Sequence, residues 1–216
     1  MQKEDYFTED NCNSKIASWE AALSHSKRWK KYTTQNTALL VIDMQNYFLD
    51  PKSHAFIPSN KIIVRNILRL INLYRSNNLP IIFTYFAIQP EEKDSIGNWW
   101  NDTVYDNSHE SKIINQIQPK NSDLVLRKKS YSAFHDTKLK EYLKSKNITN
   151  ILISGVLTNL CCDTTARDAF MRNLNVFLPI DATAAYNEEM HLSTLKNLSY
   201  GFATPISMKK IIKNDL

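Results

Sequence analysis

Three side chains with the chemistry of a nucleophilic enzyme stand next to strand-like runs of the sequence. Asp43 and Lys128 each end an apolar run, and Cys161 begins the helical stretch that follows another. A thiol can attack a carbonyl carbon, a carboxylate can take its proton, and an ammonium can stabilise the charge that forms. Each residue also has a structural interpretation: Asp as a turn cap, Lys as a solvated cation, Cys as a small buried side chain. Their shared position at strand ends favours catalysis.

Cys161 has a further property that depends on its place at the start of a helix. Unpaired backbone N–H groups and the positive end of the helix dipole favour an anion in the first turn. We therefore expect the pKa of this thiol to be lowered. The same N–H groups would hold the oxyanion of an intermediate formed on the sulfur.

The elements that must position these residues alternate between strand and helix patterns from about residue 37 onward. Strand-like runs cover residues 38–42, 81–86, 124–127, 151–154, 176–180 and 204–208. Helical patterns cover residues 61–78, 111–117, 136–146, 158–173 and 188–200. Such alternation, with nearly all-apolar strands, is typical of an α/β fold. We predict an open, doubly wound sheet of about six mainly parallel strands with helices on both faces, a Rossmann-like three-layer architecture.

One long stretch has no period and is rich in polar and aromatic residues. It runs from residue 87 to residue 109 and includes Trp99 and Trp100. Long irregular segments in compact domains are often lids or binding loops. We expect this one to close over a planar substrate, although simple packing of the two indoles remains an alternative.

The chain has 216 residues, of which 43% are hydrophobic and 23% charged, as in a globular protein with one full domain. Residues 37–216 form the predicted domain, and residues 1–36, with a helical pattern at 15–31, form an N-terminal extension. The formal net charge is +5. The 27 Lys and Arg residues are scattered, and their two small clusters, at 27–31 and 209–213, lie outside any nucleic-acid-binding motif, so no nucleic-acid partner is expected.

The cysteines and the apolar runs of the sequence indicate where in the cell the protein resides. The three cysteines, Cys12, Cys161 and Cys162, have no disulfide-like spacing and fit a reducing environment. The polar first ten residues do not form a secretory signal, and the longest apolar runs have only the length of a strand. We therefore predict a cytoplasmic protein with no membrane partner.

Three segments resemble motifs of the isochorismatase-like cysteine hydrolases. Residues 37–46, Thr-Ala-Leu-Leu-Val-Ile-Asp-Met-Gln-Asn, resemble the strand that carries the family's catalytic Asp. Residues 128–134, Lys-Lys-Ser-Tyr-Ser-Ala-Phe, resemble its lysine motif, whose register selects Lys128 over Lys129. Residues 155–161, Gly-Val-Leu-Thr-Asn-Leu-Cys, resemble its nucleophile turn and select Cys161 over Cys162. Residues 165–170 also match.

This resemblance implies an Asp43–Lys128–Cys161 triad, no cofactor, and a homo-oligomer such as a dimer or tetramer. It implies that Asp43 takes the thiol proton, that Lys128 stabilises the charged pair, and that N–H groups of Leu157 and Cys161 form the oxyanion hole. It also implies a cis peptide between Val156 and Leu157. The expected reaction is hydrolysis of a C–N bond in a small amide, ureide or carbamoyl compound through a thioester on Cys161.

Departures from individual branches of the family separate the possible activities. Nicotinamidases of the family bind a metal through an Asp and several His near the second strand. Residues 83–89 contain no His and His54 stands alone, so we predict no metal site and disfavour nicotinamide. Isochorismatases typically carry Gly at the position of Cys161, so vinyl-ether hydrolysis without the thiol is the first alternative. A catalytically idle interaction protein is the second.

Several further side chains are candidates for substrate contact because they flank the motif residues or follow a strand. They are Tyr47, Phe48, Trp99, Trp100, Tyr131, Phe134, Asn159 and His191. The aromatic residues among them have core packing as the alternative interpretation. For Asn159 we favour a role in shaping the nucleophile turn.

Overall fold

A seven-stranded sheet forms the centre of the protein in a computed structural model that describes residues 2–23 and 28–213. The strands are β1 (Thr37–Ile42), β2 (Ile81–Phe86), β3 (Leu124–Lys128), β4 (Asn150–Val156), β5 (Asn175–Pro179), β6 (Thr183–Ala184) and β7 (Thr204–Ile206). Their order is β3-β2-β1-β4-β5-β7, with β6 paired to β4, and the pairings are parallel. The predicted open doubly wound sheet is thus confirmed. The seventh strand, β6, has two residues and was too short to predict.

Burial explains why the central strands are almost wholly apolar. Every residue of β1 and of β4 is buried, as in a sheet covered on both faces. The edge strand β3 has two partly buried residues and one exposed residue among its five. Burial therefore falls from the centre of the sheet toward the β3 edge.

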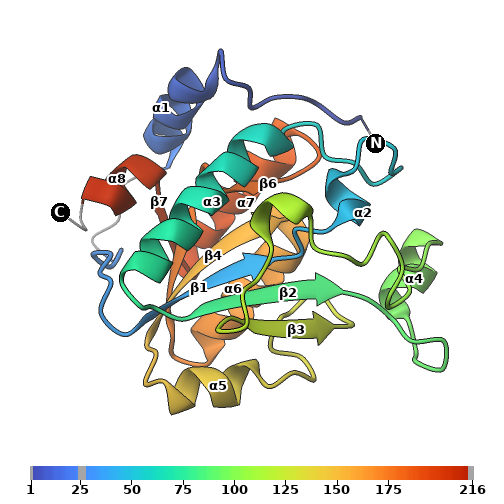
Figure 1. Cartoon of the computed structure of the whole chain (residues 1–216). Helices are drawn as coiled ribbons and strands as arrows, with labels where there is room; N and C mark the ends of the chain where they lie inside the picture. The colour runs from blue at the N-terminus through green and yellow to red at the C-terminus, as the bar shows by residue number, and fades with distance from the viewer. Residues whose placement is uncertain (1, 24–27, 214–216) are drawn as a thin grey trace.

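Helices cover both faces of the sheet. α3 (Asn60–Ser76) crosses the face toward the viewer in Figure 1, with its apolar stripe on β1, β2 and β4. α6 (Asp163–Met171) and α7 (Glu188–Gly201) pack together behind the sheet. The other helices are α1 (Cys12–Ala22), α2 (Asn46–Leu49), α4 (Ser95–Trp100), α5 (Leu139–Ser145) and α8 (Met208–Lys213).

Some predicted elements differ in extent from the observed ones. The helix predicted at 111–117 is a short 3₁₀ turn, η1 (Asn115–Ile117), and the one predicted at 158–173 begins with a π-turn, η2 (Thr158–Cys162). The irregular stretch 87–109 contains α4. Of the helical pattern at 15–31, the structure shows a helix only to Ala22, and residues 24–27 lie outside the described residues.

The strand order switches direction between β1 and β4: β2 and β3 are added on one side of β1, and β5 and β7 on the far side of β4. In open α/β sheets the crevice beyond the carboxyl ends of the strands at such a point is the usual ligand site. The arrowheads of β1, β2 and β3 in Figure 1 all point toward the side of the molecule that carries α4. Asp43 and the η2 turn follow β1 and β4 at that edge.

Residues of the N-terminal extension pack into the main hydrophobic core. Phe7 and Trp19 are buried, and their rings lie 4.9 Å apart. Trp19 also contacts His191 of α7, with ring centroids 4.8 Å apart. Figure 1 shows α1 above α3 and the first residues beside α2. Among the residues described, no helix combines the length and apolar character needed to cross a bilayer.

Candidate active site

The structure brings Asp43, Lys128 and Cys161 into direct contact. The Lys128 Nζ atom lies 2.7 Å from Asp43 Oδ2 and donates a hydrogen bond to Cys161 Sγ over 3.2 Å. It also donates to the Ser130 carbonyl over 2.8 Å. All three side chains come from separate strand ends, so the meeting depends on the sheet order rather than on local sequence. The arrangement links an acid, an ammonium and a thiol in one buried cluster.

Asp43 is held by the strand beside its own. Its backbone has φ 50°, a left-handed conformation that turns the chain sharply at the end of β1. Thr84 of β2 donates to Oδ1 over 2.8 Å. Oδ2 faces Lys128 but accepts no hydrogen bond of good geometry from any described group. One carboxylate oxygen is therefore fixed, and the other is available for a proton.

Lys128 is fully buried, yet its charge is favoured. Burial by itself lowers the pKa of an amine, but Asp43 and Cys161 oppose this and hold the pKa of Lys128 above its ordinary value. The ammonium form is thus the stable one at neutral pH. It supplies the positive charge that compensates the Asp43 carboxylate inside the core.

Cys161 is placed by a turn that only glycine permits. Gly155 has φ +111°, and a Cβ there would lie 2.1 Å from the Ile42 carbonyl oxygen. This close approach lets β4 end against β1. The chain then continues into η2, whose wide turn carries Cys161.

The expected lowering of the Cys161 pKa is wrong. Burial raises the pKa of the thiol to about 12; the Lys128 charge opposes this and the Asp43 charge adds to it. The favourable position at the start of a helix is outweighed by the loss of water around the sulfur. At rest the nucleophile is therefore a neutral thiol that must lose its proton when it attacks.

The neighbouring thiol occupies a different environment. Cys162 is fully buried, and burial raises its pKa well above the ordinary value. Cys161 lines a cavity and Cys162 does not. Adjacent residues of a helix point about 100° apart, which explains why only one sulfur reaches the cavity.

The predicted oxyanion hole involves the backbone N–H groups of Leu157 and Cys161, on either side of the start of η2. The Val156–Leu157 peptide is cis, as the family resemblance implied. Among the described residues, the Leu157 N–H has no hydrogen-bond acceptor. The Leu157 carbonyl accepts from the N–H groups of Leu160 and Cys162 and not from Cys161, which lies between them. Leu157 and Cys161 both line the same cavity.

That cavity, called here the inner pocket, has a volume of about 270 Å³. Four of the predicted contact residues line it: Tyr47, Phe48, Trp100 and Tyr131. The rest of its wall is Lys3, His54, Ala55, Phe86, Ile96, Asp102, Leu157, Leu160, Cys161 and Tyr186. An aromatic wall around a single reactive sulfur fits a compact planar ligand.

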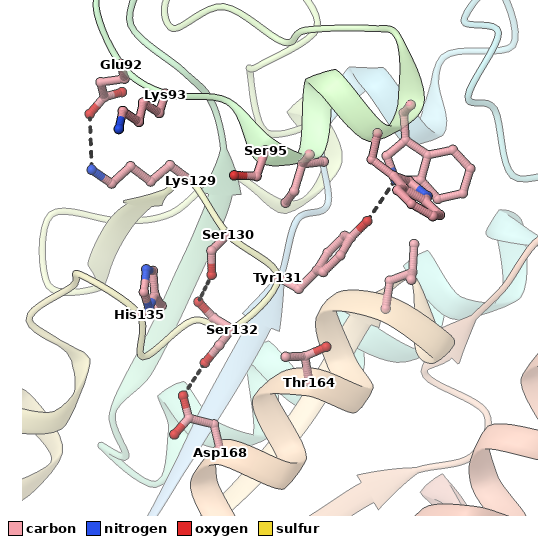
Figure 2. A pocket seen from close by; sticks show the side chains of 14 residues that line it. Glu92, Lys93, Ser95, Lys129, Ser130, Tyr131, Ser132, His135, Thr164 and Asp168 are labelled. Atoms are coloured by element: carbon pink, nitrogen blue, oxygen red, sulfur yellow. Dashed lines mark hydrogen bonds and ion pairs between the residues drawn. The ribbon is translucent and has the colours of Figure 1, made fainter.

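A second cavity of about 910 Å³, called here the outer pocket, adjoins the inner one. Ile96, Trp100, Tyr131 and Leu160 line both. Figure 2 shows Tyr131 reaching away from Ser130 and Ser132 toward an indole across the pocket. That partner is Trp100, whose Nε1 donates to the Tyr131 hydroxyl over 2.8 Å. This bond joins α4 to the lysine motif where the two pockets meet.

The two tryptophans of α4 therefore differ. Trp100 lines both pockets, whereas Trp99 lines only the outer one and is 79% exposed. The sequence predicted that the loop carrying both indoles closes over a planar substrate; of the two, only Trp100 lines the cavity that contains Cys161. Trp100 and Cys161 line the same cavity, and Trp99 does not.

Three other predicted contacts lie outside both pockets. Phe134 is buried, with the Arg172 guanidinium 5.0 Å from its ring centroid. The Asn159 amide nitrogen lies 3.8 Å from the Met190 sulfur, while its buried oxygen has no partner among the described residues. His191 is completely buried. These positions correct the expectation of substrate contact for Phe134, Asn159 and His191.

His191 instead supports the nucleophile turn. Its Nε2 donates to the Ile180 carbonyl over 3.0 Å, and its Nδ1 accepts from the Thr158 hydroxyl over 2.9 Å. Burial lowers the pKa of His191 to about 4, so the ring is neutral at pH 7. A polar residue near a helix start does not reveal from sequence which side of the helix it faces.

Sequence reasoning missed several residues of the inner pocket. Asp102 accepts from the Tyr47 hydroxyl over 2.5 Å and contacts the His54 ring nitrogen at 2.6 Å. Gln45 holds the pocket loops by bonding the Phe86 backbone at both its N–H and its carbonyl. Of these residues, only Gln45 could have been noticed from the sequence, because it lies two residues after Asp43 in the matched motif. Over the described residues, no group of three or more His, Cys, Asp and Glu side chains is arranged to hold a metal ion.

Comparison with known proteins decides the family. Residues 37–210 match the model of the isochorismatase domain. The chain belongs to the isochorismatase family. It is 39% identical over 197 residues to Nicotinamidase 3 of Arabidopsis thaliana, which spans 86% of this chain and 96% of that protein. It is 31% identical over 160 residues to Isochorismatase of Bacillus subtilis, covering 73% of this chain and 51% of that protein.

The fold comparison agrees with this assignment. The crystal structure of a cysteine hydrolase from Pseudomonas syringae pv. phaseolicola superposes with a TM-score of 0.83 at 23% identity, covering 88% of this chain and 98% of that one. This likeness shows the isochorismatase-family fold. The predicted membership of the family and the predicted hydrolase class are both confirmed.

Proposed function

We propose that this isochorismatase-family hydrolase cleaves a C–N bond of a small, planar amide, ureide or carbamoyl compound through a thioester on Cys161. The observation that carries the proposal is the contact between Lys128 Nζ and both Cys161 Sγ and Asp43 Oδ2, at the wall of an aromatic cavity. A retained thiol, a carboxylate and an ammonium in mutual contact are the arrangement that covalent catalysis needs.

The first half-reaction forms the thioester. Asp43 Oδ2 takes the thiol proton as Sγ bonds to the substrate carbonyl carbon, and the carbonyl oxygen gains the negative charge. The N–H groups of Leu157 and Cys161 hold that oxygen. The C–N bond then breaks, and Asp43 returns its proton to the leaving nitrogen, so ammonia or an amine departs.

The second half-reaction releases the acid. Asp43 takes a proton from a water molecule whose oxygen attacks the thioester carbon. The C–S bond breaks, and the Cys161 sulfur recovers the proton. Lys128 remains charged throughout, because its pKa stays above the ordinary value, and it stabilises each anionic stage.

The similarity to the relative named Nicotinamidase 3 makes nicotinamide a candidate substrate again. The missing histidines argue against nicotinamide when its recognition depends on a metal. The inner pocket, however, has aromatic walls from Tyr47, Phe48, Phe86 and Trp100, which suit a flat ring without a cation. Nicotinamide therefore belongs among the planar amides to be tested.

Vinyl-ether hydrolysis is a second candidate, supported by the relative named Isochorismatase. The retained Cys161 in contact with Lys128 argues against it, since that reaction needs no thiol. The discriminating experiment measures ammonia release from a panel of amides, ureides and carbamoyl compounds, alongside isochorismate cleavage. Ammonia release that Cys161→Ala abolishes supports the proposal. Inert C–N substrates, with isochorismate cleaved equally by Cys161→Ala, overturn it.

Three further properties complete the proposal. We expect a cytoplasmic homo-oligomer, a dimer or a tetramer, which light scattering after size exclusion measures. We expect residues 1–36 to act as an extension of the hydrolase domain. We expect α4 to act as a lid, with Trp100 as its contact to the inner pocket.

A further inference from the structure

Part of the inner-pocket wall comes from the first residues of the chain, outside the matched region 37–210. The Glu4 N–H donates to the Tyr186 carbonyl over 2.9 Å, and the Phe7 N–H donates to the Ser59 hydroxyl over 3.1 Å. These bonds fix residues 3–7, called here the N-terminal strap, between the loop after β6 and the start of α3. Lys3 thereby lies in the pocket wall.

The Lys3 ammonium has one N–H donor that no described acceptor takes up. It donates to the backbone carbonyls of His54 and Phe56, the latter over 2.9 Å, and lies 4.6 Å from the Tyr186 ring centroid. An ammonium has three N–H donors, so one remains. Among the described residues, no carboxylate lies within ion-pair distance of it. Lys3 is a cation held by neutral groups.

The other charged groups of the pocket already have partners. Asp102 accepts from Tyr47 and contacts the His54 ring nitrogen. The Lys128 charge is compensated by Asp43. Burial lowers the pKa of the Lys3 amine, and a neighbouring anion would favour its charged form again. Lys3 is therefore the charged residue of the inner-pocket wall that has no ion-pair partner among the described residues.

Tyr186 lies next to Lys3 in the pocket wall and carries a further hydrogen-bond donor. Its ring faces the Lys3 ammonium, and it lines the inner pocket with Lys3. Its hydroxyl has no hydrogen-bond partner among the described residues. A phenol and an ammonium with free N–H or O–H groups are complementary to a carboxylate, which accepts at two oxygens.

We propose that Lys3 is a specificity-determining residue that binds a carboxylate of the substrate, at the end of the molecule remote from the C–N bond attacked by Cys161. This rests on the proposed function, because it assumes that Cys161 marks the reacting end. The substrate class is then a compact amide or ureide that carries a carboxylate. A cavity of about 270 Å³ admits molecules of this size.

The test measures binding without turnover, in the Cys161→Ala background, by calorimetry at fixed low ionic strength. Two pairs of probes have nearly the same shape and replace a carboxylate by a neutral carboxamide: succinamate against succinamide, and 3-carbamoylbenzoate against isophthalamide. The anionic member of at least one pair is expected to bind about tenfold more tightly or better, the usual order for a hydrogen bond to a charged group. Lys3→Met should remove that preference, and Lys3→Arg should keep most of it.

Lys15→Met is the matched control. Lys15 belongs to the same N-terminal extension and pairs with Glu188, but it lies outside both pockets. This variant loosens the anchoring of the extension without removing the pocket cation, so it should keep the preference for the anion. An equal loss in Lys15→Met and Lys3→Met would assign the effect to anchoring and overturn the proposal.

The outcomes separate the two proposals. Equal affinity for both members of each pair, or a preference that survives in Lys3→Met, overturns the role of Lys3. A preference that depends on Lys3, combined with no ammonia release by the wild-type enzyme from any C–N compound, supports the anion site and refutes the proposed reaction. Lys3→Met should also raise the KM of anionic amides and leave that of their neutral counterparts unchanged.

Discussion

The hydroxyl of Thr158 donates to Nδ1 of His191 over 2.9 Å, and this bond ties the first residue of the nucleophile turn to α7. His191 is in turn covered by Trp19 of the N-terminal extension. A neutral, buried ring therefore supports the turn that carries Cys161. His191 lines neither pocket.

His191 should make stability depend on pH. Its folded pKa, about 4, lies below the ordinary histidine pKa of about 6.5, so the unfolded chain takes up a proton first as the pH falls. The stabilisation is thus fully present above pH 6.5 and is lost as the pH falls toward 4, by roughly 3 kcal/mol. Denaturant unfolding from pH 7.5 to 4 measures it. The variant His191→Gln should lack this part of the acid destabilisation, whereas His109→Gln, at an exposed position, should retain it. Parallel curves for wild type and His191→Gln would contradict the assignment.

Removal of the two adjacent thiols should have opposite consequences. Cys161→Ala should lower kcat by ~10³-fold or more, as expected for the loss of a covalent nucleophile. Cys162→Ala deletes a buried sulfur that reaches no cavity, so it should cost about 1 kcal/mol of stability and little activity. Steady-state ammonia release and thermal unfolding measure the two effects. Loss of activity in Cys162→Ala, with the fold intact, would show that the wrong sulfur has been assigned.

Alkylation of Cys161 should speed up steadily with pH. Because the thiol pKa is about 12, the thiolate fraction keeps increasing through pH 10 without a plateau. Lys128→Met should slow the reaction at each pH, since the ammonium stabilises the thiolate. The control is Lys129→Met, which removes the neighbouring cation paired with Glu92 and Asp136. Iodoacetamide labelling, mapped by mass spectrometry to separate Cys161 from Cys12, gives the rates. If the labelling rate of Cys161 in the wild type reached a plateau near pH 8, burial would not raise the pKa of this thiol, and the prediction would be wrong.

The Trp100–Tyr131 bond should matter for substrate affinity. Trp100→Phe keeps an aromatic ring but removes the donor, and KM should rise about fivefold, the equivalent of one hydrogen bond of about 1 kcal/mol. Tyr131→Phe should have the same effect, and the double variant should add little more. Trp99→Ala is the matched control, because this exposed indole lies only in the outer pocket. If the effects of the two substitutions on KM are strictly additive, the two side chains act independently, and the hydrogen bond between them is not the cause of the change in KM.

Chelation should leave activity unchanged. The proposed steps use the carboxylate, the ammonium, the thiol and backbone donors, and none requires a metal ion. Dialysis against EDTA followed by the ammonia assay is the measurement, with the dialysed enzyme also supplied with zinc. Activity that falls on dialysis and returns with zinc would refute the prediction of a metal-free site.

The sequence carried enough information to predict the sheet and the three reactive residues. The apolar runs predicted six of the seven strands because strands buried on both faces leave little room for polar residues, as in β1 and β4. Asp43, Lys128 and Cys161 were identifiable because each follows such a run within a matched motif. The two-residue β6 gave no pattern, since alternation needs a longer run to be visible.

The rest of the site depends on contacts between distant segments. Lys3 meets carbonyls of residues 54 and 56 and the ring of Tyr186, and no local spacing encodes that meeting. The Cys161 pKa was predicted in the wrong direction because the helix start is visible in sequence, whereas the burial that outweighs it is not. His191 was misplaced for a related reason: its neighbours in α7 do not reveal the carbonyl and hydroxyl that surround it.

The N-terminal strap has a practical consequence for anyone who prepares this enzyme. Since Lys3 stands in the inner-pocket wall, an affinity tag fused to the amino end would begin within a few residues of the cavity. Its basic or histidine-rich side chains would compete for the same carbonyls and for any anionic compound in the assay. A tag placed after α8, which Figure 1 shows far from α4, avoids that interference. Kinetic constants compared between tagged forms should therefore record which end carries the added peptide.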